Sequence, residues 1–87
     1  MNNTRINTIP NKLINLERLD IVNNKNIITL PVSLTELINL YLCDCSMLDN
    51  IHNYPNLQYL FVSKCNKIIK IHNLNNLIDM YIYIIVN

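Results

Sequence analysis

The stretch Leu37-Ile38-Asn39-Leu40-Tyr41-Leu42-Cys43-Asp44-Cys45 decides the fold, because its apolar spacing returns three more times along the chain. Equivalent stretches begin at Leu16, Leu57 and Leu77, at steps of 20 or 21 residues. A fixed period of this length is a signature of repeat architectures, in which each copy buries its apolar side against the next. The repeat therefore governs how every other feature of the sequence is interpreted.

Six positions of the repeat are apolar in every copy. The columns are Ile6/Ile27/Leu48/Ile68, Ile9/Leu30/Ile51/Ile71, Leu13/Leu34/Tyr54/Leu74, Leu16/Leu37/Leu57/Leu77, Leu19/Leu40/Leu60/Met80 and Ile21/Leu42/Val62/Ile82. With 51% hydrophobic residues in the chain, a preset register would be apolar throughout about once in ten million trials. The columns predict a continuous core shared by successive copies.

The spacing L-x-x-L-x-L-x-x-N/C resembles the leucine-rich repeat family from Asn3 to about Ile82. The Cys-containing turns, with Ile9-Pro10 and Leu30-Pro31, are most similar to its short Cys-containing and L-P-type repeats, and the composition resembles small members from AT-rich protists or their large DNA viruses. The resemblance implies an α/β repeat solenoid of about four repeats: an arc with a short-stranded parallel sheet on its concave face and irregular or short helical return segments. We expect a single domain over residues 1–87, with a partial repeat at 1–15 and repeats starting near 16, 37, 57 and 77.

Alternation at period two places Leu19 and Ile21 inward and their neighbours outward on a short strand. The column that follows each strand is Asn3, Asn24, Cys45 and Cys65. The family resemblance implies that these side chains form a structural turn ladder bonded to the backbone of neighbouring loops. The capping-box spacing of Ser33-Leu34-Thr35-Glu36 predicts a short helical turn after Pro31.

Charge and composition argue against several function classes. A net charge of +1 with 15% charged residues lacks the concentrated basic face that nucleic-acid binding needs. The longest apolar run, Met80 to Val86, is too short to span a membrane. The N-terminus has no secretory signature and the three cysteines are an odd number, so we expect reduced thiols and an intracellular, cytoplasmic protein.

Catalytic, cofactor and metal sites find no support in the sequence. No nucleophile has a histidine and an acid at matching repeat positions, so we expect a non-enzyme without a cofactor. Zinc ligand types are present in Cys43, Cys45, Cys65, His52 and His72. We expect no metal site, because the cysteines should point to different sides of the chain and the histidines lie at the other end of the repeat. Lys64, Lys67 and Lys70 are expected to form a solvated edge.

The outward strand positions are the candidate partner-binding surface. They are Arg18, Asp20, Asn39, Tyr41, Tyr59, Phe61, Asp79, Tyr81 and Tyr83. Exposed aromatics often form the centre of protein interfaces, although tyrosine also favours strands whatever its function. We expect a non-catalytic module that binds an unidentified protein through this face. Two alternatives stay open: a structural unit that self-associates through its open strand edges, the C-terminal strand among them, and a truncated fragment of a longer array without its own activity.

Overall fold

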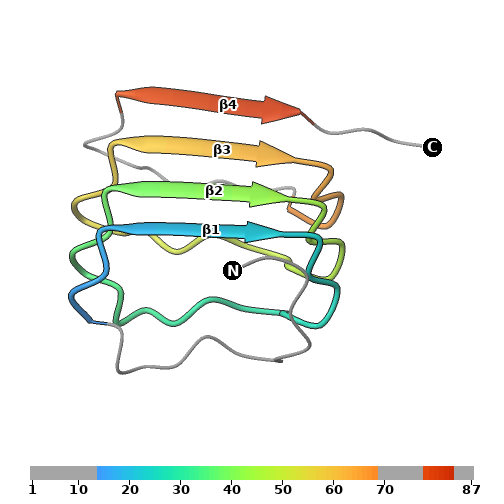
Figure 1. The fold of residues 1–87 in the computed structure, drawn as a ribbon, viewed down its shortest axis with the longest axis horizontal. Helices are drawn as coiled ribbons and strands as arrows, with labels where there is room; N and C mark the ends of the chain where they lie inside the picture. Colours follow the sequence, from blue (N-terminus) through green and yellow to red (C-terminus); the bar gives the residue numbers. More distant parts are fainter. Residues whose placement is uncertain (1–13, 69–77, 84–87) are drawn as a thin grey trace.

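A computed structural model of the chain describes residues 14–68 and 78–83. Its strands are β1 (Arg18–Val22), β2 (Asn39–Cys43), β3 (Tyr59–Ser63) and β4 (Asp79–Tyr83). All neighbouring pairs are parallel, and the order in the sheet is β1-β2-β3-β4 (Figure 1). The predicted short-stranded parallel sheet is confirmed. The expected partial repeat at 1–15 lies almost entirely outside the described residues.

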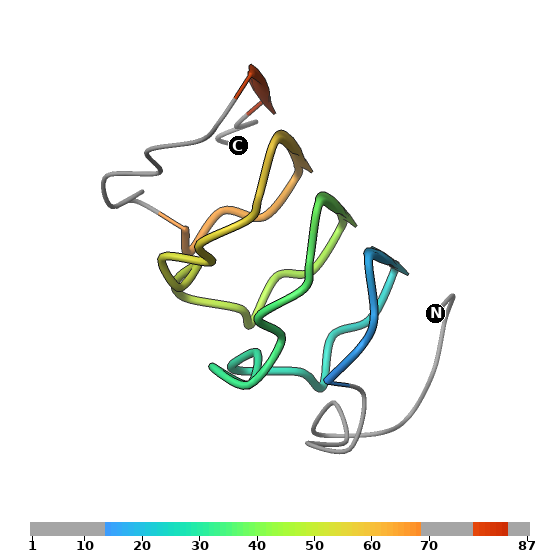
Figure 2. The same ribbon diagram turned by 90° about the vertical axis from the view of Figure 1, so that its left-hand side faces the viewer.

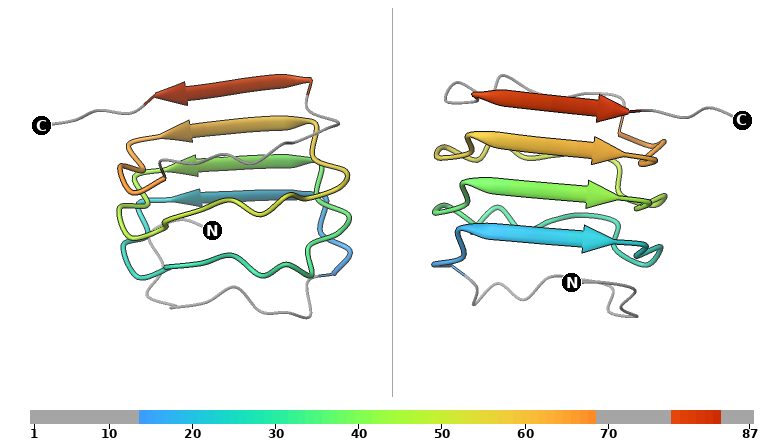
Figure 3. Two further views of the ribbon diagram at one scale, coloured as in Figure 1. Left: turned by 180° about the vertical axis from the view of Figure 1, so that it is seen from behind. Right: turned by 45° about the horizontal axis from the view of Figure 1, so that its top comes forward.

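The strand register follows the sequence repeat without a shift. Leu40 pairs with Leu19 on one side and with Leu60 on the other, and Leu42 pairs in the same way with Ile21 and Val62. From β1 to β2 and from β2 to β3 the chain turns away from the sheet, runs back on the other side of the molecule and returns beside the strand it left (Figure 2). Views from behind and above show these return segments lying one beside the next (Figure 3). Each copy therefore contacts the copies before and after it.

The core lies between the strands and the return segments. Its buried hydrophobic residues are Leu19, Ile21, Ile27, Leu30, Leu34, Leu37, Leu40, Leu42, Cys45, Leu48, Ile51, Tyr54, Leu57, Leu60, Val62, Cys65 and Ile68. Within residues 14–68 they include every member of the six apolar columns except Leu16, which packs against the cluster while partly buried. The column prediction is confirmed for residues 14–68. Ile6 and Leu74 lie outside the described residues, and the side chains of Met80 and Ile82 on β4 are not described.

Each strand from β1 to β3 is followed directly by a residue in the left-handed conformation. Asn23, Asp44 and Lys64 have φ angles of 53°, 55° and 57°. The amides of Asn23 and Asp44 then donate to the carbonyls of Cys43 and Ser63 at the end of the next strand, at 2.8 and 2.9 Å. Asn and Asp tolerate this conformation better than other residues that carry a Cβ atom. The chain has no glycine, so these residues make the turn that glycine often makes elsewhere.

The described residues contain no helix, so the helical turn predicted for Ser33–Glu36 is wrong. Two tight turns replace it: the Thr35 amide donates to the Ser33 carbonyl at 2.8 Å, and the Leu37 amide to the Leu34 carbonyl at 3.3 Å. A helix must gain several consecutive bonds to offset its nucleation cost. Leu34 and Leu37 are both buried, and they are only three positions apart. The chain between them is too short to form the consecutive backbone hydrogen bonds of a helix.

The 20- and 21-residue copies differ by one residue in the return segment. After Leu30 the chain takes four residues to reach the next core position, whereas after Ile51 it takes three to reach Tyr54. The shorter copy bonds back to the longer one, because His52 Nε2 lies 2.7 Å from the Leu30 carbonyl and the Tyr54 hydroxyl donates to the Pro31 carbonyl at 2.9 Å. These bonds satisfy carbonyls that the irregular return segment leaves without a backbone donor.

Candidate binding surface on the sheet

Six of the outward-facing side chains of β1, β2 and β3 form a surface that we call the sheet face. They are Arg18, Asp20, Asn39, Tyr41, Tyr59 and Phe61. Arg18 and Tyr59 are exposed and the other four are half-buried. Outward projection follows from strand alternation, since Leu19, Leu40 and Leu60 point into the core between them.

The remaining predicted partner residues belong to β4. Asp79, Tyr81 and Tyr83 stand in register with Tyr59, Phe61 and Ser63 of β3. Their backbone therefore continues the sheet face by one strand. Their side chains lie outside the described ones, so the surface is built here from β1 to β3.

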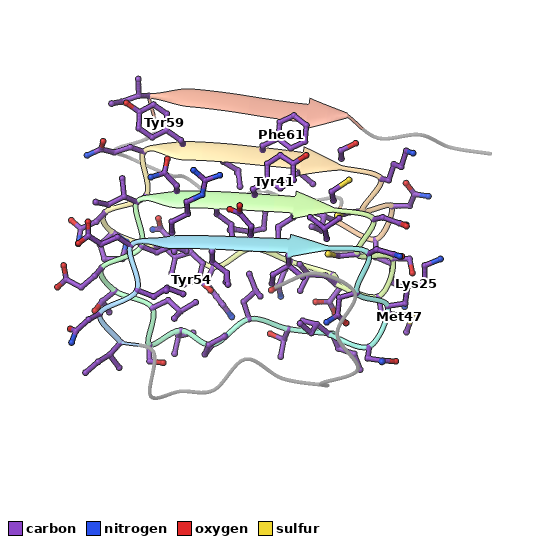
Figure 4. The ribbon with its side chains drawn as sticks, viewed as in Figure 1. Lys25, Tyr41, Met47, Tyr54, Tyr59 and Phe61 are labelled. Atoms are coloured by element: carbon purple, nitrogen blue, oxygen red, sulfur yellow. The ribbon has the colours of Figure 1, made fainter. Side chains whose placement is uncertain are left out.

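An aromatic pair forms the apolar centre of the sheet face. The rings of Tyr41 and Phe61 lie at paired positions on β2 and β3, with centroids 4.5 Å apart and planes only 4° from parallel (Figure 4). Cross-strand neighbours on one face are close enough for such contact, and stacked aromatic pairs contribute about 0.5–1.5 kcal/mol beyond the area they bury. The stack holds both rings in a defined position before any partner arrives.

An ion pair borders the aromatic pair on β1. Arg18 Nε donates to Asp20 Oδ1 at 3.0 Å, and Arg18 Nη2 donates to Asp20 Oδ2 at 3.1 Å. The hydrogen bond and the negative charge of Asp20 raise the pKa of Arg18. Because the Arg18 side chain is 68% exposed, the pair adds little to stability. Its main effect is to cancel the two charges of this surface locally.

A hollow of about 160 Å³ lies on the sheet face. Its lining consists of Arg18, Asp20, Asn39, Leu40, Tyr41, Tyr59, Leu60 and Phe61. Six of these eight residues are the sheet-face side chains, and Leu40 and Leu60 come from the middle of β2 and β3. The structure therefore brings the first six predicted partner residues together around one depression.

The turn column begins, in the described residues, with a buried asparagine. Asn24 is 0% exposed, and its Oδ1 accepts hydrogen bonds from the amides of Asn26 at 3.0 Å and Ile27 at 3.2 Å. The side chain thus satisfies two backbone donors where the chain leaves β1. Asn3, the earlier position of the same column, lies outside the described residues.

The next two members of the column are buried free thiols that link successive copies. Cys45 Sγ donates to the Ile21 carbonyl of the preceding copy at 3.6 Å, and the Cys45 amide donates to Cys65 Sγ at 3.4 Å. Cys65 Sγ also donates to the Ser63 carbonyl at 3.3 Å. The side-chain contact with Cys65, together with burial, raises the pKa of the Cys45 thiol. Both thiols are buried and bonded to backbone groups, which is the usual setting of unreactive cysteines.

The zinc-type residues do not converge in the part of the chain that the structure describes, where no three His, Cys, Asp or Glu side chains are arranged to hold a metal ion. Cys43 lies on the outer side of β2, whereas Cys45 is buried. His52 contacts the ring of Tyr54 edge-on, with centroids 5.9 Å apart. His72, which follows an isoleucine in the next copy as His52 does in its own, lies outside the described residues. Lys64 and Lys67 are exposed, and Lys70 is not described.

Two features of the sheet face were missed by the sequence analysis. Arg18 and Asp20 are two residues apart on one strand, which places them on the same side, so their spacing could have predicted the ion pair. Leu40 and Leu60 line the hollow although their side chains are buried. Nothing in their inward-facing positions signals that contribution.

Within residues 14–68 and 78–83, no helix is long and apolar enough to cross a membrane. Comparisons of the chain with family models, with curated proteins and with solved structures find no match.

Proposed function

We propose that this chain is a leucine-rich-repeat solenoid that binds a protein partner, without catalysis, through the concave side of its sheet. The repeat assignment is supported by three observations that agree: the sequence period, the parallel strand order and the burial of the apolar columns. In such an array each copy stabilises its neighbours, and outward strand positions can vary without loss of the core.

The hollow on the sheet face is the observation that carries the binding proposal. It joins an ordered aromatic pair, an exposed tyrosine and polar side chains in one depression. Aromatic side chains at the centre of an interface bury large areas with few rotatable bonds, and a polar rim gives specificity. The three free thiols also favour a reducing, intracellular location for this module.

The experiment is affinity capture from the native cells with the tagged chain and two variants. The double substitution Tyr41→Ala with Phe61→Ala removes the aromatic pair, and we expect it to abolish capture of a partner that the wild type retains. The control Val32→Ala alters a return-segment residue that is 70% exposed, and it should capture as well as wild type. Circular dichroism checks that both variants fold. Equal capture by the double variant would contradict the proposal.

A second function, self-association, is favoured by the position of β4. Among the described strands, β4 is the last in the sheet, and an unpaired strand edge is a template for another chain. If the chain self-associates, analytical sedimentation should show an apparent mass that rises with protein concentration. Ile84→Lys, placed directly after β4 in the sequence, would then lower that mass, whereas a monomer at all concentrations would remove this function.

A further inference from the structure

The hollow on the sheet face has an unusual combination of aromatic lining and cancelled charge. Its two charged residues, Arg18 and Asp20, already bind each other through two hydrogen bonds. The other lining residues are uncharged. A strongly acidic or basic partner would gain no net opposite charge here, so charge complementarity favours an uncharged segment.

Three polar groups of the hollow have no hydrogen-bond partner within the described part of the chain. They are the side-chain amide of Asn39 and the hydroxyls of Tyr41 and Tyr59. Each can donate a hydrogen bond. The hollow therefore offers donors and aromatic surface, and a matching ligand presents carbonyl oxygens and compact apolar groups.

We propose that the hollow binds an uncharged, proline-rich segment in the polyproline II conformation. This inference rests on the proposed protein-binding function and names the chemistry of the partner. Proline has no amide hydrogen, and a polyproline II segment makes no internal hydrogen bonds, so its carbonyls are free to accept from Asn39, Tyr41 and Tyr59. Grooves lined by aromatic side chains are a recurrent docking site for such segments.

The dimensions of the sheet agree with this ligand. The hollow extends over β1, β2 and β3, and two strand spacings of about 4.8 Å amount to about 10 Å. One polyproline II turn contains three residues with a rise of about 3.1 Å each, or about 9 Å. A segment that crosses the strands thus presents one equivalent residue near Arg18 on β1 and the next near Tyr59 on β3.

Both the aromatic pair in the hollow and a polyproline II segment are rigid before they bind, which favours their association. The Tyr41 and Phe61 rings are already stacked, and a polyproline II segment is largely extended before it binds. Little conformational entropy is lost when two preorganised surfaces meet. A flexible segment with the same carbonyl groups would have to order its backbone on the sheet face, and it should bind more weakly.

The test is a titration of the ¹⁵N-labelled full chain with a decaproline peptide, followed by amide NMR shifts. The matched control peptide is a Gly-Ser decapeptide, which is uncharged and flexible. Decaproline should move the resonances of Asn39–Tyr41 and Tyr59–Phe61, and the Gly-Ser peptide should not. Tyr59→Ala should weaken decaproline binding about tenfold or more, as expected when a tyrosine that contacts the ligand is truncated, while Val32→Ala leaves it unchanged.

Three outcomes of the titration would contradict the polyproline inference. Absence of shifts with decaproline at millimolar concentration, equal binding of the Gly-Ser peptide, or shifts that map away from the hollow would each overturn the inference. Circular dichroism of Tyr59→Ala separates lost binding from lost folding, and Asn39→Ala repeats the test without touching an aromatic ring. If decaproline fails while the aromatic double variant still loses its captured partner, the binding function stands and the polyproline specificity falls.

Discussion

Replacing Leu42 by alanine tests whether one shared core holds the copies together. Leu42 is 0% exposed in the central part of the sheet, and its register partners are Ile21 on β1 and Val62 on β3. A buried Leu→Ala change costs about 2–5 kcal/mol through lost burial and the cavity left behind. Both neighbouring copies line that cavity, so neither can close it alone.

This loss is large beside the expected total. At about 0.05–0.15 kcal/mol per residue, a chain of 87 residues has a free energy of unfolding of about 4–13 kcal/mol. A loss of about 3 kcal/mol would lower the melting temperature by about 12–24 °C, since each kcal/mol shifts a domain of this size by about 4–8 °C. Leu42→Ala should therefore have a melting temperature far below that of the wild type. If the free energy of unfolding of the wild type is only about 4 kcal/mol, the variant should fail to fold.

Thermal and urea unfolding, followed by far-ultraviolet circular dichroism, measure the effect. Val32→Ala is the matched control, because this side chain is 70% exposed and surface changes usually stay within about 0.5 kcal/mol. The reasoning would be refuted if both variants lost the same stability, or if Leu42→Ala remained within about 1 kcal/mol of wild type.

Three further predictions concern the turns and the return segment. Asn24→Ala leaves two backbone donors unsatisfied, and we expect it to lower the free energy of unfolding by about 1–3 kcal/mol. Asn24→Cys copies the residue at the next two turns and should lower it less. Urea unfolding measures both changes, and a larger loss for Asn24→Cys would contradict the turn ladder. Lys64→Asn should raise the free energy of unfolding by about 0.5–1 kcal/mol, because Asn tolerates the left-handed conformation better. A lower free energy of unfolding in the same urea experiment would show that Lys64 is not strained there. Burial raises the pKa of Tyr54 above its usual 10.0, so unfolding releases a proton above pH 10 and stability falls as pH rises through that value. Tyr54→Phe should show a shallower alkaline decline in pH-dependent melting, and parallel curves would count against this cause.

The strands and the core could be predicted from the repeat, because with a period of 20 or 21 residues only in-register pairing of the copies buries all their apolar side chains. If every copy carries the same alternating segment, in-register pairing of Leu19, Leu40 and Leu60 buries all of them at once. A shift by one residue would expose the whole set. Burial of the described columns was therefore readable from the sequence.

The helical turn at Ser33–Glu36 was predicted wrongly because local capping signals were given more weight than tertiary packing. Leu34 and Leu37 are buried at the two ends of the turns in this segment, and His52 and Tyr54 bond to Leu30 and Pro31 shortly before it. Those bonds come from another copy, and a local motif carries no information about them.

The amino-acid pattern alone indicated which side chains face inward and which face outward, because these follow from periodicity and the need to bury apolar surface, and the family resemblance implied that the strands run parallel. The hollow, the near-parallel stack of Tyr41 on Phe61 and the sulfur contacts between Cys45 and Cys65 required the folded chain. Each depends on distances between copies that lie about 20 residues apart in the sequence, and such distances are set by packing in three dimensions.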